Sequence, residues 1–224
     1  MKAQDSVDAA LGVEELRAGF LRYTREAYAL LPVMDHRRIL DIGCGSGSAT
    51  MELVRLGGSE VIGIDTDAAA LSEMKRRLEA DGLGDRVEVA STSLFDVSFP
   101  DESFDVLWEE GALHLLDRGR SLPVCHRLLK PGGFLVMHET VAWFEEAGDW
   151  LRTVGFRVFD QVLLPKRSWW TDYYEPLEAR IRVLREAHGE DLEPGKLEQH
   201  EREIAMVRAD PERFDCGFFI VQKP

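Results

Sequence analysis

One feature constrains the fold of this chain most: a short apolar run that breaks into regularly spaced glycines. The run occupies residues 39–42. Glycine then recurs at every second position, at Gly43, Gly45 and Gly47. Residues 48–55 have the apolar periodicity of a helix, and a second apolar run at 61–64 ends in Asp65. This order predicts a buried parallel strand, a glycine turn, a crossover helix and a neighbouring parallel strand.

The residues at the two strand ends indicate the kind of ligand. Glycines at a strand-to-helix turn let the backbone adopt positive φ and pass close to a bound molecule. An acid at the tip of the next strand, here Asp65, can accept hydrogen bonds from both vicinal hydroxyls of a ribose. The pattern therefore predicts the nucleoside-binding half of an α/β sheet.

The spacing of the glycines selects among nucleosides. Dinucleotide-binding turns follow GxGxxG and cradle a pyrophosphate. Here the motif is DxGxGxG, led by Asp41, and Ser48 stands where the dinucleotide pattern needs glycine. An acid beside the ligand repels a pyrophosphate but suits a ligand with an ammonium and a sulfonium group. S-adenosylmethionine is such a ligand, and a nicotinamide-binding domain is the alternative.

Further motifs follow in a recognisable order. Residues 99–105 read FPDESFD, and residues 128–133 read LLKPGG. With the glycine motif at 41–47 and Asp65, these resemble the class I S-adenosylmethionine-dependent methyltransferases over roughly 23–139. The resemblance implies a Rossmann-like, doubly wound, mostly parallel sheet of seven strands in which the last strand is antiparallel.

The remaining elements follow from periodicity and from the resemblance. Later strands are expected at 87–90, 105–108, 134–137, 157–164 and 217–221, the last as an antiparallel edge. Helices are expected at 11–31, 68–81, 122–129 and 141–154.

A long segment between the sixth and last strands departs from the minimal fold. It contains an aromatic cluster at 169–174 and two charged helical segments, roughly 176–188 and 194–207. A structureless connection of this length is uncommon in a compact domain, so we interpret it as a helical lid over the acceptor. The expected organisation is a cofactor-binding core at 1–164, an acceptor insertion at 165–213 and the last core strand at 214–224.

Composition narrows the substrate and the setting. Acidic residues outnumber basic ones 41 to 27, giving a net charge of −14. Nucleic-acid binding needs clustered lysine and arginine, so this composition disfavours a nucleic-acid partner. The cysteines, Cys44, Cys125 and Cys216, lack metal-site spacing, and no metal is expected. No apolar run reaches membrane-spanning length and residues 1–16 hold no signal-like apolar region, so we expect a cytoplasmic protein without a membrane partner. The oligomeric state stays open, with a homodimer as one possibility.

The resemblance implies cofactor contacts at the ends of the first four strands and in the N-terminal helix. After the first strand come Asp41, Gly43, Cys44 (through its backbone), Gly45 and Gly47. After the second strand come Asp65 for the ribose and Thr66 beside it. After the third, Ser93 or Asp96 binds the adenine amino group, with Leu94 adjacent. After the fourth, Glu109 borders the methionine part. Tyr23 either covers that part, with Thr24, or is an ordinary core residue.

Methyl transfer from a sulfonium needs alignment and dehydration, and it needs a base only when the acceptor arrives protonated. His114 and Glu110, just past the fourth strand, are the first candidates for that base, and His138 and Glu139 come next. A purely structural role is the alternative for His114. The expected acceptor-pocket walls are Trp169, Trp170, Tyr173 and Tyr174, which otherwise anchor the lid.

The acceptor is expected to be a small molecule. Residues 107–112, LWEEGA, resemble the IWxEGA signature of a small-molecule branch of the family. The [ND]PP[YFW] motif of many amide- and base-methylating enzymes is absent. An RNA or protein methyltransferase, a non-catalytic S-adenosylmethionine-binding module and a nicotinamide oxidoreductase are the alternatives.

Overall fold

The computed structural model describes residues 3–33, 37–57, 59–188 and 194–224. The chain divides into two compact units. The larger contains residues 21–163 and 216–224, and the smaller contains residues 1–20 and 164–215. Within the described ranges, no helix has both the length and the apolar character needed to cross a bilayer.

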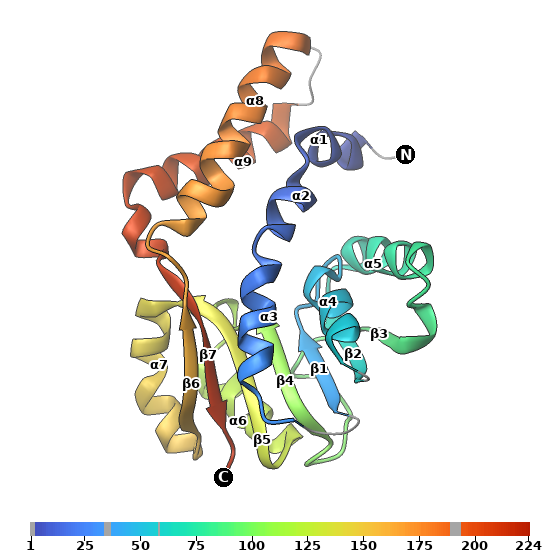
Figure 1. The fold of residues 1–224 in the computed structure, drawn as a ribbon, viewed down its shortest axis with the longest axis vertical. Coiled ribbons are helices and arrows are strands. Elements are labelled where there is room, and N and C mark those ends of the chain that lie inside the picture. The colour runs from blue at the N-terminus through green and yellow to red at the C-terminus, as the bar shows by residue number, and fades with distance from the viewer. Residues whose placement is uncertain (1–2, 34–36, 58, 189–193) are drawn as a thin grey trace. The chain divides into compact units, whose positions relative to one another are not determined.

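The larger unit is built on one seven-stranded sheet in the order β3-β2-β1-β4-β5-β7-β6 (Figure 1). The strands are β1 (Arg38–Ile42), β2 (Glu60–Asp65), β3 (Val87–Ser91), β4 (Phe104–Glu110), β5 (Leu129–Thr140), β6 (Arg157–Leu163) and β7 (Cys216–Gln222). Neighbours from β3 to β5 pair in parallel, and β7 is antiparallel to both of its neighbours. The predicted α/β class, with seven strands and an antiparallel last strand, is confirmed.

The prediction that the last strand forms an edge is wrong. β7 lies between β5 and β6, and β6 is the edge strand. The burial of the two strands explains this order. Residues 216–221 of β7 are all buried, as a strand covered on both faces requires, whereas β6 is exposed at nearly every position.

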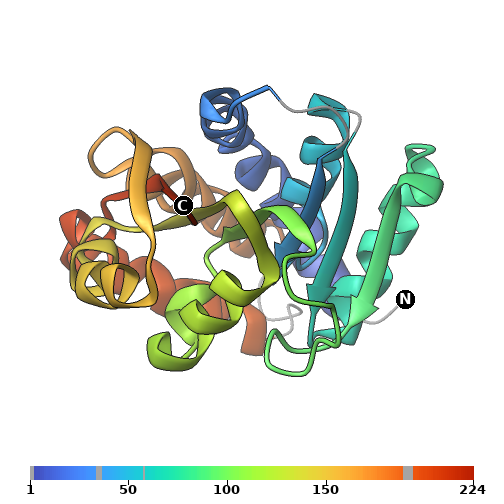
Figure 2. The same ribbon diagram turned by 90° about the horizontal axis from the view of Figure 1, so that it is seen from below.

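Helices cover both faces of this sheet. They are α3 (Leu21–Leu30), α4 (Ser48–Leu56), α5 (Ala68–Ala80), α6 (Arg118–Leu128) and α7 (Val141–Val154). In Figure 2, α3 lies on one side of the sheet and α6 and α7 lie on the other. The apolar sides of α6 and α7 pack on Leu40, Leu107 and Leu135. Because β1 and β4 end side by side where the strand order reverses, their carboxyl ends form the point at which such sheets bind ligands.

The smaller unit is helical. It contains α1 (Ala3–Leu11), α2 (Val13–Ala18), a π-helical turn (Trp169–Tyr174), α8 (Glu175–His188), α9 (Pro194–Ala209) and a short 3₁₀ turn (Pro211–Phe214). The two helices expected in the insertion correspond to α8 and α9.

The N-terminal segment differs from expectation in two ways. The helix expected at 11–31 is interrupted at Gly12, between α1 and α2, and again at Gly19 and Phe20, between α2 and α3, because glycine favours a turn over a continued helix. Residues 1–20 also group with the insertion rather than with the core. Arg180 of α8 contributes to this grouping, since its guanidinium donates to the carbonyl oxygens of Leu11 (2.9 Å) and Gly12 (3.1 Å).

Candidate active site

The glycine turn after β1 has the conformation that the sequence predicts. Gly43, Gly45 and Gly47 have φ of +72°, +53° and +85°, where L side chains are strained. A Cβ on Gly43 would lie 2.5 Å from Ala112 Cβ, and one on Gly47 would lie 2.5 Å from Met74 Cγ. Around a Cβ on Gly45, by contrast, no described atom lies within 4 Å. The outer two glycines therefore allow close packing, and Gly45 faces open space where a ligand can approach the backbone.

Asp65, at the end of β2, is hydrogen-bonded to this turn. Its Oδ2 accepts from the Gly45 N–H at 2.8 Å, and its Oδ1 accepts from the Asp67 N–H at 2.8 Å. Each carboxylate oxygen has a further lone pair. The carboxylate thus holds the turn and can still accept from ribose hydroxyls. Thr66, the next residue, is exposed beside it.

Asp41 lies beneath the turn, and its side chain is buried. The fully buried Thr50 hydroxyl donates to Asp41 Oδ2. Burial, together with repulsion from Glu110 and Asp65, raises the pKa of Asp41 to about 7, although the Thr50 hydrogen bond opposes the rise. Asp41, Asp65 and Glu110 therefore form a cluster of carboxyl groups that favours a cation.

The turn after β3 is organised by Ser93. Its hydroxyl accepts from the Phe95 N–H at 3.2 Å, and its carbonyl accepts from the Asp96 N–H at 3.0 Å. Leu94 is buried at the turn, whereas Asp96 is exposed. Both Ser93 and Asp96 remain candidates for the adenine contact.

Glu110, the last residue of β4, is connected to α3. Its Oε1 accepts from the Thr24 hydroxyl and from Trp108 Nε1, both at 2.9 Å. Burial raises the pKa of Glu110, and these two donors oppose the rise. Tyr23, next to Thr24, is buried, and its hydroxyl accepts from the Arg22 guanidinium at 2.8 Å. Core packing therefore accounts for much of the Tyr23 side chain, and its contact with the cofactor stays a prediction.

Glu109 points to the opposite face of the sheet from Glu110. Its carboxylate is fully buried, and Oε2 accepts from the N–H groups of Ala112 (2.9 Å) and Leu113 (3.2 Å). The other oxygen, Oε1, has no hydrogen-bond partner among the described residues. Burial and the nearby Glu139 carboxylate raise the pKa of Glu109 well above its usual range. Glu109 thus holds the backbone after β4 through these two hydrogen bonds. Its predicted contact with the methionine part of the cofactor stays a prediction.

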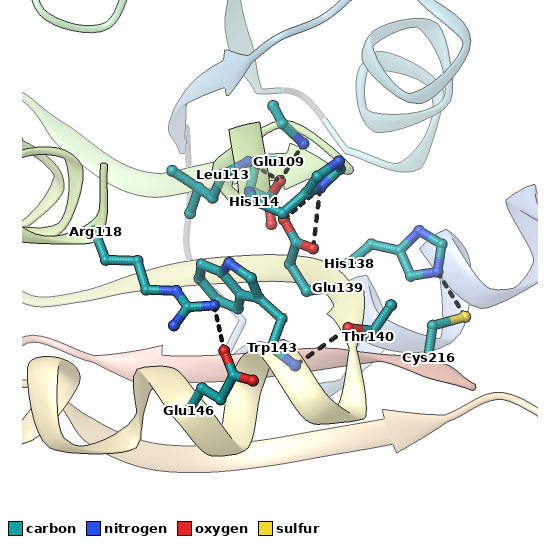
Figure 3. A network of polar contacts seen from close by, with 11 residues as sticks. Glu109, Leu113, His114, Arg118, His138, Glu139, Thr140, Trp143, Glu146 and Cys216 are labelled. Carbon is teal, nitrogen blue, oxygen red and sulfur yellow. Dashed lines mark hydrogen bonds and ion pairs between the residues drawn. The ribbon is translucent and has the colours of Figure 1, made fainter. Parts of the chain in front are cut away.

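His114 and Glu139 form a pair at the ends of β4 and β5 (Figure 3). His114 lies in the 3₁₀ turn Leu113–Leu115, and its N–H donates to Glu139 Oε1 at 2.8 Å. Its Nδ1 is 3.2 Å from each Glu139 oxygen. The Glu139 side chain is 3% exposed and that of His114 is 45% exposed. The hydrogen bond to Glu139 raises the pKa of His114.

His138 points away from this pair (Figure 3). It is buried, its ring stacks on Phe218 at 4.6 Å between centroids, and Nε2 lies 3.4 Å from Cys216 Sγ. Burial lowers the pKa of His138 to about 4. Its neutral, packed ring gives no support to the predicted contact with the acceptor.

The four aromatic residues predicted as acceptor-pocket walls, Trp169, Trp170, Tyr173 and Tyr174, lie in the smaller unit. Within that unit Trp169 stacks on Phe20 at 4.6 Å, and Tyr173 packs edge-on against Tyr174 at 4.8 Å. The Arg208 guanidinium lies 5.1 Å from the centre of a Trp170 ring. Packing inside the unit thus employs all four, and their contact with an acceptor stays a prediction.

Two contributors to the site escaped sequence reasoning. Thr50 donates to Asp41, and the Ala112 methyl group packs where Gly43 has no Cβ. In the sequence, Thr50 is indistinguishable from an ordinary helix residue. No local pattern shows that Ala112 contacts the glycine turn. Cys44 is buried within the glycine turn, where burial raises the pKa of its thiol, so the thiol is inert.

Comparison with known proteins gives the site its context. A family model described as a methyltransferase domain matches residues 40–137. An uncharacterized methyltransferase of Mycobacterium bovis is 31% identical over 184 residues, which cover 76% of this chain and 72% of that protein. The 27-O-demethylrifamycin SV methyltransferase of Amycolatopsis mediterranei is 29% identical over 140 residues, 60% of this chain and 52% of that enzyme.

The chain spans about half the length of the first curated relatives that it matches, such as 54% of a Haemophilus influenzae protein and the 52% just given. The fold is shared more completely. An S-adenosylmethionine-dependent methyltransferase of Geobacter sulfurreducens, solved with S-adenosylhomocysteine, superposes with a TM-score of 0.70 at 21% identity, over 91% of each chain. With its glycine turn, Asp65 and strand order, this chain belongs to the class I S-adenosylmethionine-dependent methyltransferases.

Proposed function

We propose that this protein transfers the methyl group of S-adenosylmethionine to a small-molecule acceptor by in-line displacement. One observation carries the proposal: the interacting carboxyl groups of Asp41, Asp65 and Glu110 lie beside a glycine turn whose middle residue faces open space. A diphosphate-bridged coenzyme would be repelled by this cluster, whereas a sulfonium and an ammonium are attracted to it.

The cofactor contacts follow from this chemistry. Asp65 would accept from the ribose hydroxyls, and Gly45 would let the backbone approach the ligand. Asp41 would favour the ammonium group, either directly or through the turn that it supports. Either Ser93 or Asp96 would accept from the adenine amino group. When bound, S-adenosylmethionine supplies an activated methyl group with a good leaving group.

Two features support a small acceptor. The net charge of −14 disfavours a polyanionic substrate. A relative is named for methylating a demethylrifamycin, which is a small molecule. Methylation at oxygen, nitrogen or carbon is compatible with both features.

Of the candidate bases past β4, His114 is the better placed. Glu110 Oε1 already accepts from Thr24 and Trp108, whereas the His114 side chain is 45% exposed. We therefore assign proton removal or acceptor orientation to His114. Glu110 contributes negative charge near the cofactor.

The proposal is tested by following the label from methyl-labelled S-adenosylmethionine into pools of small metabolites, RNA and protein. We expect label in the metabolite pool, and we expect Asp65→Ala to reduce it strongly when S-adenosylmethionine is not saturating. Label confined to RNA or protein would contradict the small-molecule assignment. Cofactor binding without any transfer would identify a non-catalytic binding module instead.

A further inference from the structure

The His114–Glu139 pair has the geometry of a histidine whose ring is fixed by a buried carboxylate. Glu139 lies on β5, and its side chain is 3% exposed. Both of its oxygens lie 3.2 Å from His114 Nδ1, and Oε1 also accepts from the His114 N–H at 2.8 Å. Ring and backbone of His114 are therefore both hydrogen-bonded to one carboxylate.

This geometry determines which ring nitrogen is available. A carboxylate only accepts hydrogen bonds, so Nδ1 must carry the proton. In the neutral ring Nε2 is then the acceptor, which reverses the tautomer that a free imidazole favours. The ring lies beside Gly111, where His114 Cε1 is 3.9 Å from a Cβ position. The half-exposed side chain can thus offer a basic Nε2 just past β4.

Glu109 affects the charge of the pair. It is fully buried, close to Glu139, and its Oε1 has no partner among the described residues. Of two neighbouring buried carboxyl groups, one keeps its proton more easily. Among the described residues, Glu109 interacts electrostatically with Glu139 on β5 and with Glu110 on the opposite side of β4, and it also raises the pKa of Cys125 on α6. The raised pKa of Glu109 and its Oε1, unpartnered within the part of the chain that the structure describes, assign the proton to that residue, whereas Glu139 Oε1 accepts from the His114 N–H.

We propose that Glu139 is a positioning residue: by fixing the ring of His114, it leaves Nε2 free to take the proton from a substrate hydroxyl as that hydroxyl is methylated. This inference rests on the function proposed above. As the methyl group moves, the acceptor oxygen forms a bond to carbon, and the carbon–sulfur bond breaks with its electron pair passing to sulfur. The hydroxyl proton moves to Nε2. The resulting imidazolium, stabilised by Glu139, then releases its proton to water.

The charges around the pair favour a hydroxyl that arrives protonated. The Glu139 carboxylate on β5 lies against His114, so an acceptor that has already lost its proton and become an anion is repelled. A tertiary amine or a sulfide has no proton to give up at the reacting atom. A neutral hydroxyl is weakly nucleophilic and gains most from a base.

The direct test is ¹⁵N NMR of histidine-labelled protein across pH, with S-adenosylhomocysteine bound. We expect neutral His114 to carry its proton on Nδ1 and to titrate above the usual pKa of histidine. Glu139→Gln should lower the pKa of His114 and shift the neutral ring towards the Nε2-protonated form. Glu109→Gln, which replaces a protonated carboxyl with a neutral group of the same shape, should leave the His114 titration in place.

These variants separate a positioning role from a structural one. An Nε2-protonated ring in the wild type, or a His114 titration that does not change in Glu139→Gln, would overturn the proposal. Every sample is also tested for S-adenosylhomocysteine binding by calorimetry. This measurement separates failure of the proposed function from failure of the inference about Glu139. If the wild type fails to bind, the proposed function fails. If it binds but the tautomer is wrong, only the inference about Glu139 fails.

The acceptor class is tested with a mixed panel of phenols, alcohols, tertiary amines and sulfides. We expect O-methylated products, a loss of about 10²-fold or more in kcat/KM for His114→Ala, and a pH optimum that moves down in Glu139→Gln. Methylation of only the tertiary amines or sulfides would contradict the hydroxyl assignment.

Discussion

The carboxyl ends of β1 and β4 lie side by side in the sheet, yet the chain uses them differently. After β1, Gly45 faces open space, and Asp65 at the end of the neighbouring β2 accepts from the Gly45 N–H while retaining free lone pairs. After β4, Glu109 accepts from two backbone N–H groups, and Glu110 accepts from Thr24 and Trp108. The first end offers polar groups to a ligand, whereas the second uses its carboxylates to shape the chain that presents His114. Acidic residues at adjacent strand ends can therefore have unrelated roles.

The largest expected effect is on cofactor affinity and tests Asp65, at the end of β2. Asp65→Ala removes the acceptor of the Gly45 N–H and of the ribose hydroxyls, so the affinity for S-adenosylhomocysteine should fall about 100-fold, given the ~1.5–3 kcal/mol of a hydrogen bond to a charged group. The control is Asp67→Ala, which removes a helix cap that accepts from Ala69 and Ala70. It should cost about 1 kcal/mol of stability and leave the affinity nearly unchanged. Equal affinities of the two variants, measured by calorimetry, would contradict the assignment.

The glycines of the turn divide into packing and binding positions. Gly47→Ala places a Cβ 2.5 Å from Met74 at a positive φ, and should cost about 2 kcal/mol of unfolding free energy. Gly45→Ala meets no described atom within 4 Å and should cost about 1 kcal/mol, but its methyl group fills ligand space and weakens cofactor binding about tenfold or more. Urea unfolding and calorimetry measure the two effects. A Gly45→Ala variant with wild-type affinity would show that this space is not used.

Asp41 should couple cofactor binding to pH. Its pKa of about 7 in the free protein means that it is largely protonated at pH 6, and a bound ammonium and sulfonium favour the ionised form. The affinity for S-adenosylmethionine should therefore rise about tenfold from pH 6 to pH 8, with nearly one proton released on binding at pH 6 and almost none at pH 8. Calorimetry in buffers of different ionisation enthalpy measures this release. Asp41→Asn should remove the dependence, and an unchanged slope in that variant would assign it to another group.

The smallest effect concerns Glu109 at the end of β4. Burial raises the pKa of this carboxyl group above its usual value of 4.5. Above about pH 4.5 the folded protein therefore keeps a proton at Glu109 that the unfolded chain has released. Stability is therefore lost as pH rises from that value towards the folded pKa. Glu109→Gln removes this loss and should gain about 1 kcal/mol over the wild type at pH 8 but little at pH 4, as judged by denaturant midpoints. A constant difference across pH would show that Glu109 is ionised in the folded protein.

The same two strand ends show what the sequence alone could predict. The turn after β1 was predictable because glycine spacing and a following acid are local features with direct backbone consequences. The end of β4 was not, because Glu109 and Glu110 are adjacent in sequence but point to opposite faces. The partners of His114 and Glu110, namely Glu139 and Thr24, lie 25 and 86 residues away.

The prediction of element boundaries and strand order was limited by similar non-local effects. The apolar periodicity of 11–31 runs across Gly19 and Phe20, so it predicted one helix where α2 and α3 belong to different units. The antiparallel β7 was expected, but its place between β5 and β6 depends on long-range pairing. The one local signal for two neighbouring strands is the continuous apolar run at 216–221, which is buried in the structure.

The central claim is that the turn after β1 and Asp65 bind the methyl donor. Calorimetric titration of the wild-type protein with S-adenosylhomocysteine, with NAD as the competing ligand, measures this most directly. We expect stoichiometric binding of S-adenosylhomocysteine and no heat from NAD. Binding of NAD in its place would contradict the account.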